Sequence, residues 1–454
     1  MGDAIFEKHL KQIVANINYE YQEGRMSGIM LLKLVVEKLP QELLQRHAQH
    51  IFLPLVLQLV NDDSKDCRAE VSQCITLVLK RSSKESLQTF QTYCSRWSNQ
   101  NGSLRVASLQ VFGILVDCRS DFVKSSSIDL IWIQRIEKNL LEREEYGWET
   151  TYFSLVCIEN LLEEFRHVLI QQSNLITNII ACLVDPHPWI KKSSSRILNR
   201  ILTSESAMEL LSQEDGKLFE IVRNTLFQFN APEGEQSQDL SDLGVKTLML
   251  ALPLMAENPQ FCYTKDNFSN EESTSVNGRD PVFWLLRRLS QIVKTKGSKR
   301  RMTVFKCYAA FVASSFEIVA PHLKLMLEGL HRSSIEAKNE IENQKLSSSS
   351  FGSSDLHNNV VNTEHSFAEE VLGLIEEKCS SSTEFVTAYA EVKRRAYNKK
   401  QQRKIELKSE AAQHPEIAAE RRMKKQERNK QRKKRRSEEK SRERRGGEKK
   451  FRFR

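Results

Sequence analysis

The sequence predicts an all-α fold, and three observations lead to this prediction. Apolar residues recur three and four positions apart, which is the spacing of one face of a helix. No segment alternates apolar and polar residues between turn signals, as a half-buried strand would. The 454 residues are 40% hydrophobic and 28% charged, so the chain has enough apolar side chains to bury a core.

Three segments show the helical spacing most clearly. Each places its apolar residues on one side of a helix, so each predicts a helix with one buried face. The apolar positions are Val71, Cys74, Ile75, Val78 and Leu79 in the first segment, Ala107, Val111, Ile114, Leu115 and Cys118 in the second, and Phe305, Tyr308, Ala309, Val312 and Phe316 in the third.

The predicted helices recur at a regular spacing along residues 1–343. A short polar turn followed by a basic residue opens several of them, at Arg68, Arg105, Lys191, Lys246 and Arg300. The sequence separations between the first three of these residues are close to one and two periods of roughly 40–47 residues, the period that HEAT-type helix pairs show. The spacing therefore predicts that 1–343 is a HEAT- or armadillo-like α-solenoid, and it leaves an irregular helical bundle as the alternative.

The pattern changes after residue 343. A Ser-rich stretch makes 344–366 a predicted flexible linker, because serine and glycine cannot pack a core. Apolar residues at helical spacing, from Phe367 to Ile375, then predict terminal amphipathic helices over 367–392. The remaining residues, 393–454, are a basic tail with too few apolar side chains to fold alone. We expect it to be disordered or to form solvated helices interrupted at Pro415.

The charge is divided unevenly between these parts. Residues 393–454 contain 27 Lys and Arg against 9 Asp and Glu, a net charge of +18, whereas residues 1–392 carry −9. Such asymmetry is typical of nucleic-acid contact or nuclear import. A membrane partner is not expected, because no apolar or lipidated segment accompanies the tail and no apolar run reaches the roughly 18 residues of a membrane span.

No arrangement of residues predicts catalysis, a metal or a cofactor. The nearest cysteines, Cys67 and Cys74, are seven positions apart, and no C-x-x-C, H-x-x-x-H or Gly-rich phosphate loop occurs. His47 and His50 share a predicted helix but have no cysteine or carboxylate at ligand spacing, so both are expected at the surface. The sequence therefore predicts a protein that is not an enzyme and has no small-molecule substrate.

Two groups of cations are candidate binding sites. The tail crowds nine cations into thirteen positions, which would bind phosphates by charge rather than read base sequence, and would also serve as a nuclear import signal. The alternative is a tail that only improves solubility. These residues are Lys424, Lys425, Arg428, Lys430, Arg432, Lys433, Lys434, Arg435 and Arg436.

The second group lies on the predicted solenoid. Lys192, Arg196 and Arg200 are four positions apart and form a stripe on one side of a helix. Lys299, Arg300 and Arg301 add a second patch. Both could meet RNA phosphates or an acidic partner, and the alternative for each is an outer face that only contacts solvent.

Several runs of the sequence resemble one known family, in the same order along the chain. They are Ile51-Phe52-Leu53-Pro54-Leu55-Val56-Leu57-Gln58-Leu59-Val60-Asn61-Asp62-Asp63, Pro186-His187-Pro188-Trp189-Ile190-Lys191 with the helix that ends Ile197-Leu198-Asn199-Arg200-Ile201-Leu202, Lys393-Arg394-Arg395-Ala396, and Pro415-Glu416-Ile417-Ala418-Ala419. Together they resemble the C-terminal region of small-subunit processome component 20, a large HEAT-repeat scaffold.

The resemblance implies a scaffold without enzymatic activity that resides in the nucleus and the nucleolus. It implies pre-ribosomal RNA and other ribosome-assembly proteins as partners, and a place in the assembly that processes the small-subunit ribosomal RNA precursor. It also implies that this chain corresponds to the C-terminal part of much longer proteins, with an exposed apolar face near its N-terminus. A HEAT-repeat adaptor that binds only proteins, for example in nuclear transport, is the alternative function.

Overall fold

In the computed structural model, the described residues form helices joined by turns and short loops. The chain forms two compact units, Met1–Lys378 and Cys379–Arg454. The structure describes residues 3–100, 102–166, 169, 173–205, 207–211, 216–230, 237–262, 280–294, 298–345, 355–379, 382–416, 419–424, 426–431, 434 and 437.

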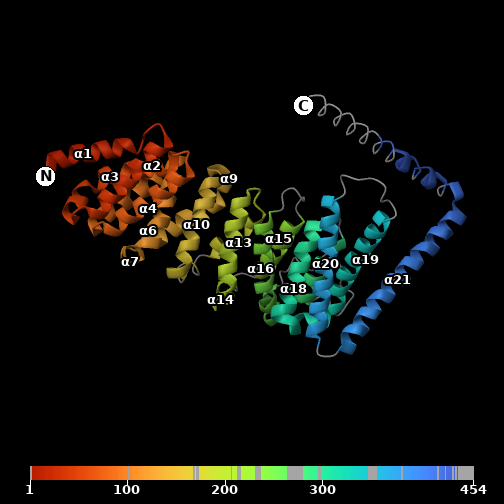
Figure 1. The fold of residues 1–454 in the computed structure, drawn as a ribbon. Helices are drawn as coiled ribbons and strands as arrows, with labels where there is room; N and C mark the ends of the chain where they lie inside the picture. The colour runs from red at the N-terminus through yellow and green to blue at the C-terminus, as the bar shows by residue number, and fades with distance from the viewer. Residues whose placement is uncertain are drawn as a thin grey trace, which may run out of the picture. The chain divides into compact units, whose positions relative to one another are not determined.

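The first unit consists of two layers of helices, and successive helix pairs along the sequence add one helix to each layer. In one layer, each helix packs against the next helix of the same layer: α2 (Gln22–Lys38), α4 (Lys65–Arg81), α6 (Ser103–Cys118), α10 (Trp148–Glu164), α13 (Pro188–Leu202), α16 (Gln238–Glu257), α18 (Ser298–Val319) and α20 (Asp355–Lys378). The helices α13, α16 and α18 stand side by side in Figure 1.

The second layer covers the first. It comprises α3 (Gln41–Asn61), α5 (Lys84–Trp97), α8 (Ile128–Leu141), α12 (Ser173–Ala181), α15 (Lys217–Phe229), α17 (Pro281–Lys294) and α19 (Leu323–Lys345). The helix α1 (Asp3–Asn16) packs on α2, and short helices α7 (Ser120–Ser125), α9 (Arg143–Tyr146) and α14 (Ala207–Leu211) join longer ones. Three 3-10 turns complete the described elements: η1 (Cys182–Val184), η2 (Pro259–Cys262) and η4 (Ala320–His322).

This arrangement confirms the predicted all-α solenoid. No strand occurs among the residues that the structure describes. The helices of the first layer begin at Gln22, Lys65, Ser103, Trp148 and Pro188, which is a spacing of about 40 residues and matches a HEAT-type period. Each helix pair buries its apolar face against its neighbours in the stack rather than within the pair alone.

Most of the periodic apolar residues are buried in the core, as the sequence predicts. All five in α4 are buried, from Val71 to Leu79. The spacing predicts the core face of α18 only in part. Phe305, Tyr308 and Val312 are fully buried there, whereas Phe316 is half-buried at the end of the helix.

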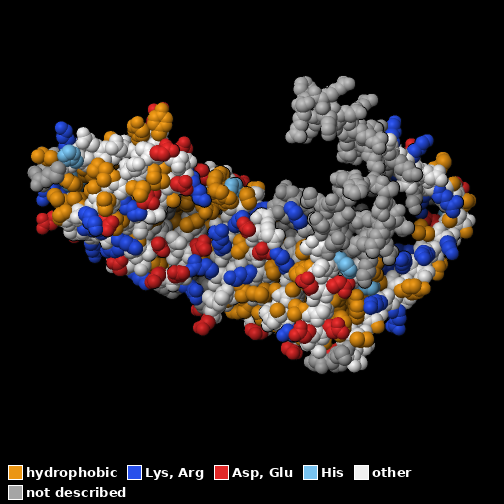
Figure 2. Space-filling view, in the orientation of Figure 1, with side chains coloured by type: hydrophobic (Ala, Val, Ile, Leu, Met, Phe, Trp, Pro, Cys, Tyr) orange, Lys and Arg blue, Asp and Glu red, His pale blue; other side chains and the backbone are white. Residues whose placement is uncertain are grey.

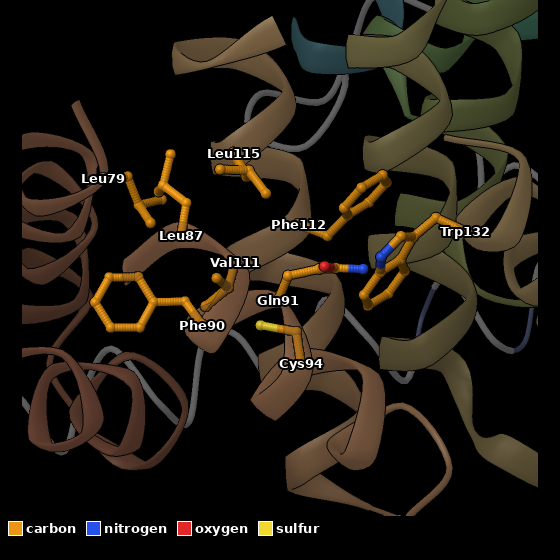
Figure 3. Close-up of a pocket in the computed structure, with 9 residues that line it drawn as sticks. All are labelled: Leu79, Leu87, Phe90, Gln91, Cys94, Val111, Phe112, Leu115 and Trp132. Atoms are coloured by element: carbon orange, nitrogen blue, oxygen red, sulfur yellow. The ribbon is translucent and has the colours of Figure 1, made fainter. Parts of the chain in front are cut away.

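Aromatic stacking fills the interior between α5, α6 and α8. The ring of Phe112 lies parallel to that of Trp132, with centroids 4.3 Å apart, and Phe90 stacks on Phe52 at 4.0 Å. Figure 3 shows Phe112 and Trp132 side by side, with Phe90 on the opposite side of the residues that line a cavity of about 10 Å³. That volume is about one water-sized sphere, so this interior is packed rather than hollowed for a ligand.

One stretch, Lys299–Ile335, is long and apolar enough to cross a membrane by length and composition alone. It comprises nearly all of α18 and the first part of α19, separated by the 3-10 turn η4. The helix α18 packs against α16 and α20, and α19 packs against α17 and α20. This packing accounts for the apolar character of the stretch, since the interior of a two-layer stack is buried on several sides.

The segment between α19 and α20 differs from the expected flexible linker in its second half. Helix α19 ends at Lys345 and α20 begins at Asp355, so 355–366 is helical. The serine run itself lies outside the described residues, and the predicted division at 343 and 366 stays a prediction.

The second unit contains the long helix α21 (Ser382–Gln413). The predicted start of the basic tail, residue 393, lies inside this helix. Helix α21 ends two residues before Pro415, where the proline ring excludes a continuous helix. The ion pair between Glu420 and Lys424 forms at four-residue spacing further along the chain.

Large apolar side chains are exposed on the first helices of the chain. Ile5 of α1 and Met30 and Leu34 of α2 are 54%, 57% and 52% exposed.

The same region corrects one expectation, because His47 is buried while His50 is exposed. The ring of Phe6 on α1 lies 5.3 Å from that of His47, so packing of α1 covers a histidine that its own helix would leave in solvent.

Candidate nucleic-acid interface

The tail cations that the structure describes are helical and exposed. They are Lys424, Arg428, Lys430 and Lys434. Lys424 is paired with Glu420, whereas the other three form no ion pair with any residue that the structure describes. The other predicted tail residues lie outside the described residues: Lys425, Arg432, Lys433, Arg435 and Arg436. Free cations on a solvated helix are available to phosphates.

The residues of the predicted basic stripe lie on α13, where acidic neighbours pair with two of them. Ile190, Ile197 and Ile201 are buried on the other side of the helix. The ammonium of Lys192 lies 2.8 Å from a carboxylate oxygen of Asp239 on α16. Arg200 pairs with the carboxylate of Glu163 on α10, and donates to the carbonyl oxygen of Glu159 at 3.1 Å. Two of the three predicted cations therefore join neighbouring repeats.

Arg196 is the exception within this stripe. It is exposed and has no ion pair among the described residues. If this stripe meets RNA phosphates, as the sequence predicts, Arg196→Gln should weaken RNA binding and lower the salt dependence of the dissociation constant by about one phosphate contact. Lys192→Gln should change both less, because Asp239 already neutralises that charge. Binding measured across a salt series checks this, and equal losses from the two variants would contradict it.

Within the second predicted patch, Arg301 is drawn into the fold, whereas Lys299 is exposed. Arg301 is largely buried, donates to the carbonyl oxygen of Val293 at 3.1 Å, and its guanidinium lies 3.2 Å from a carboxylate oxygen of Glu364 on α20. Lys299 and Arg300 also have interactions within the protein. The start of α18 is thus held against its neighbours by cations, and the patch as an RNA site stays a prediction.

Polar bonds of this kind recur between repeats. Asn160 donates to the carbonyl oxygen of Gly113 at 3.0 Å, Asn199 to that of Leu243 at 3.2 Å, and Gln228 to that of Leu183. The partners are 44 to 47 positions apart in the sequence, which is one repeat. Because these bonds satisfy carbonyl oxygens of neighbouring helices, they fix the register of the stack.

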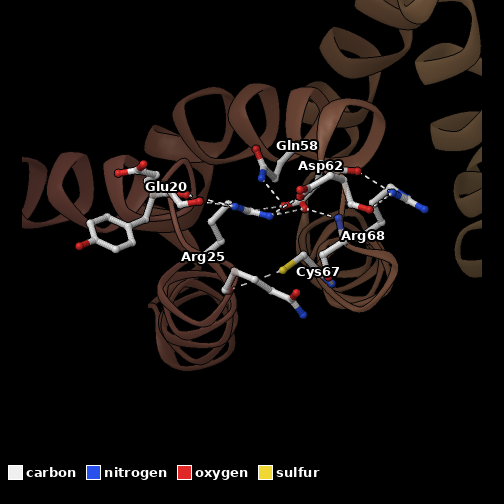
Figure 4. Close-up of polar contacts among 10 residues, drawn as sticks. Glu20, Arg25, Gln58, Asp62, Cys67 and Arg68 are labelled. Carbon is white, nitrogen blue, oxygen red and sulfur yellow. Dashed lines mark hydrogen bonds and ion pairs between the residues drawn. The ribbon is translucent and has the colours of Figure 1, made fainter. Parts of the chain in front are cut away.

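The N-terminal repeats hold a buried polar network, which Figure 4 shows. Arg25 of α2 makes two parallel bonds to the carboxylate of Asp62, at 2.9 and 3.0 Å, and a further bond of 2.9 Å to the carbonyl oxygen of Glu20. The backbone N–H of Ser64 and the amide of Gln58 also donate to Asp62. Asp62 is fully enclosed, so this carboxylate has a structural role.

An exposed aromatic cluster was not predicted as a site. It joins Trp148 and Tyr152 of α10 to His187 and Trp189 at the start of α13. The α13 half of the cluster could have been singled out from the sequence, because Pro186-His187-Pro188-Trp189 is one of the runs that carries the family resemblance. The sequence gives no indication that Trp148, 41 positions earlier, lies beside it.

The described residues offer little reactive chemistry. No group of three metal-binding side chains occurs among them. Burial raises the pKa of Cys74 to about 12 and that of Cys118 to about 11, so both thiols are protonated at neutral pH. Cys307 is fully buried and its pKa is raised for the same reason. These three are the reduced thiols, on or beside core faces, that the apolar spacing predicts.

Comparison with solved structures finds proteins of low similarity. A designed armadillo repeat protein in complex with the peptide (KR)4 is 14% identical, covers 53% of this chain and 99% of its own, and has a TM-score of 0.34. An engineered protein is 10% identical, covers 84% and 88% of the two chains, and has a TM-score of 0.38. No protein-family model matches the chain.

Comparison with curated proteins finds one protein in two yeasts. U3 small nucleolar RNA-associated protein 20 of Saccharomyces cerevisiae is 22% identical over 434 residues, which is 93% of this chain and 17% of the relative. That of Schizosaccharomyces pombe is 26% identical over 206 residues, 43% of this chain and 8% of the relative. The chain thus spans less than a fifth of the length of these relatives. Its similarity to U3 small nucleolar RNA-associated protein 20, over nearly all of its own length, confirms the resemblance found in its sequence and is consistent with a C-terminal region of that protein.

Proposed function

We propose that this chain is a non-enzymatic scaffold of the small-subunit processome. It would act in pre-rRNA processing and small ribosomal subunit assembly, in the nucleolus. The observation that carries the proposal is the similarity to U3 small nucleolar RNA-associated protein 20 over 93% of the chain. A stack of helices held by bonds between repeats suits this role, because rigid repeats keep partners at fixed separations.

The basic tail is the proposed contact with pre-ribosomal RNA. Its support is charge and exposure, since Arg428, Lys430 and Lys434 are exposed and form no ion pair with a described residue. Such cations neutralise phosphates and release counterions, which gives affinity without base specificity. The folded unit would supply contacts to other assembly proteins.

The test is RNA binding across a salt series, with the full chain and a variant in which the nine predicted tail cations are replaced by glutamine. We expect the variant to bind a structured RNA much more weakly, with a salt slope reduced by about 0.7 to 0.9 for each phosphate that the variant no longer neutralises. The nine replacements change no apolar side chain of the core, and circular dichroism checks that the helices remain.

The outcomes separate the proposal from its alternative. A steep salt slope that flattens in the variant supports the tail as an RNA contact. If the full chain binds no RNA at moderate salt, the RNA contact is wrong, and an adaptor that binds only proteins becomes the better interpretation. A variant that binds as tightly as the natural chain places the RNA contact on the folded unit instead.

A further inference from the structure

The aromatic cluster on the folded unit is rigid and open to solvent. The rings of Trp148 and His187 are parallel, with centroids 4.1 Å apart, and Trp189 meets Trp148 edge to face at 5.5 Å. Tyr152 lies 5.7 Å from Trp189. Trp189 is 53% exposed and Trp148 40%, whereas the core residue Trp132 is 1% exposed. Hydrophobic side chains reach the surface near α9 in Figure 2.

The start of α13 fixes the position of Trp189. Pro188 occupies the first turn, and the ring of His187 accepts a hydrogen bond from the backbone N–H of Trp189 at 3.3 Å. The backbone N–H of His187 in turn donates to the carboxylate of Asp185 at 2.8 Å. A tryptophan held by its own helix cap loses little conformational freedom when a flat ligand stacks on it.

The charge beside the cluster is positive on the α13 side. Trp189 and Arg196 are seven positions apart and therefore lie on the same face of α13. Lys192 lies between them but is paired with Asp239, so Arg196 supplies the positive charge of this face. The first turn of α13 itself has no acidic residue, and the carboxylate just before it, Asp185, already accepts a bond from the backbone N–H of His187 and lies 3.9 Å from Arg143. On the α10 side, Glu149 follows Trp148, and its negative charge repels an anion there. The α13 side of the cluster is therefore the favoured side for an anion.

We propose that this cluster is a stacking site for an unpaired RNA base, with Trp189 as the platform and Arg196 beside the following phosphates. The proposal rests on the proposed RNA-binding function and adds to it the one element that the tail lacks, because the tail cations have almost no aromatic residues among them. Aromatic faces stack on any base, whereas a cation on the same face favours a nucleic acid over an apolar peptide.

The experiment follows tryptophan fluorescence while the full chain is titrated with a short single-stranded RNA. Stacked bases quench indole emission, and moderate salt suppresses the contribution of the tail. The matched variants are Trp189→Ala, Trp189→Phe and Phe227→Ala, the last an aromatic residue of α15 that is 65% exposed. We expect Trp189→Ala to weaken binding by roughly tenfold and to remove most of the quenching. Trp189→Phe should retain affinity, and Phe227→Ala should behave as the natural chain.

A duplex RNA of the same sequence separates this site from the tail. It should bind through charge with little quenching, because paired bases cannot stack on Trp189. If single-stranded RNA binds the natural chain and Trp189→Ala equally, the stacking site is wrong while the proposed function stands. If no RNA binds but a proline-rich peptide quenches the fluorescence, the cluster is a peptide site and the inference is overturned. Absence of binding by any RNA contradicts the proposed RNA contact as well.

Discussion

Replacing Asp62 by alanine is expected to destabilise the N-terminal repeats by about 3 kcal/mol. The side chain of Asp62 is fully enclosed, and it receives paired bonds from Arg25 across one repeat of the sequence. Truncation leaves that guanidinium with only the more exposed Asp63 and backbone carbonyls as partners among the described residues. Hydrogen exchange of amides in α2, α3 and α4, compared with those in α16 and α18, measures the effect locally.

Asp63 provides the matched control. It also contacts Arg25, at 2.5 Å, but its side chain is 88% exposed. Water can replace that contact, so Asp63→Ala should leave the exchange rates close to those of the natural chain. Equal effects from the two variants would contradict the structural role of the enclosed carboxylate.

The same carboxylate predicts an acid sensitivity. Burial acts to raise the pKa of Asp62, but hydrogen bonds from Arg25, from the N–H of Ser64 and from Gln58 outweigh it and lower the pKa below the ordinary value. A lowered pKa in the folded state gives stability that is present above the ordinary pKa of an aspartate, and that is lost as the pH falls through the folded-state value. The N-terminal repeats of the natural chain should therefore open in acid, and Asp62→Asn should remove this part of the pH dependence.

Replacing Phe112 by alanine is expected to cost about 3–5 kcal/mol of unfolding free energy. Phe112 is 1% exposed and stacks on Trp132, so truncation leaves a cavity between α6 and α8 that adds to the small one already there. Urea unfolding followed by circular dichroism measures the loss. Phe227→Ala is the control, because a side chain that is 65% exposed contributes little to the core.

A conservative change at the stacked partner refines this prediction. The indole N–H of Trp132 is buried and has no hydrogen-bond partner among the residues that the structure describes. Trp132→Phe removes that unsatisfied donor along with some volume, so it should cost clearly less than Phe112→Ala. A loss from Trp132→Phe as large as that from Phe112→Ala would show that ring size, rather than the stacked pair, dominates this part of the core.

The sequence predicts the elements of this fold better than their contacts. Val71, Ile75 and Val78 identify a core face because helical spacing is a local property of the chain. Burial of His47 depends on α1, which packs across it, and no local pattern contains that information. The acidic partner of Lys192 lies one repeat away, so its position is equally hidden from a local pattern.

The candidate sites also differ in whether a local pattern or only the folded structure reveals them. The tail is recognisable from composition alone, because charge density does not depend on folding. The aromatic cluster requires that Trp148 and Trp189 meet, which only the stacking of α10 on α13 brings about. A single tryptophan at the start of a helix, in contrast, resembles many core residues.

The bonds between repeats have a consequence for how the chain acquires its structure during synthesis. From Arg25–Asp62 to Lys192–Asp239 their partners are 37 to 48 residues apart, and the longest in the last repeats, Arg301–Glu364 and Lys306–Asp242, are 63 and 64 apart. Contacts this local give a low relative contact order for a chain of 454 residues, which favours rapid folding. Each repeat can dock on the previous one as soon as the next few dozen residues leave the ribosome. Assembly can then proceed from the N-terminus onward, without waiting for the C-terminus to be made.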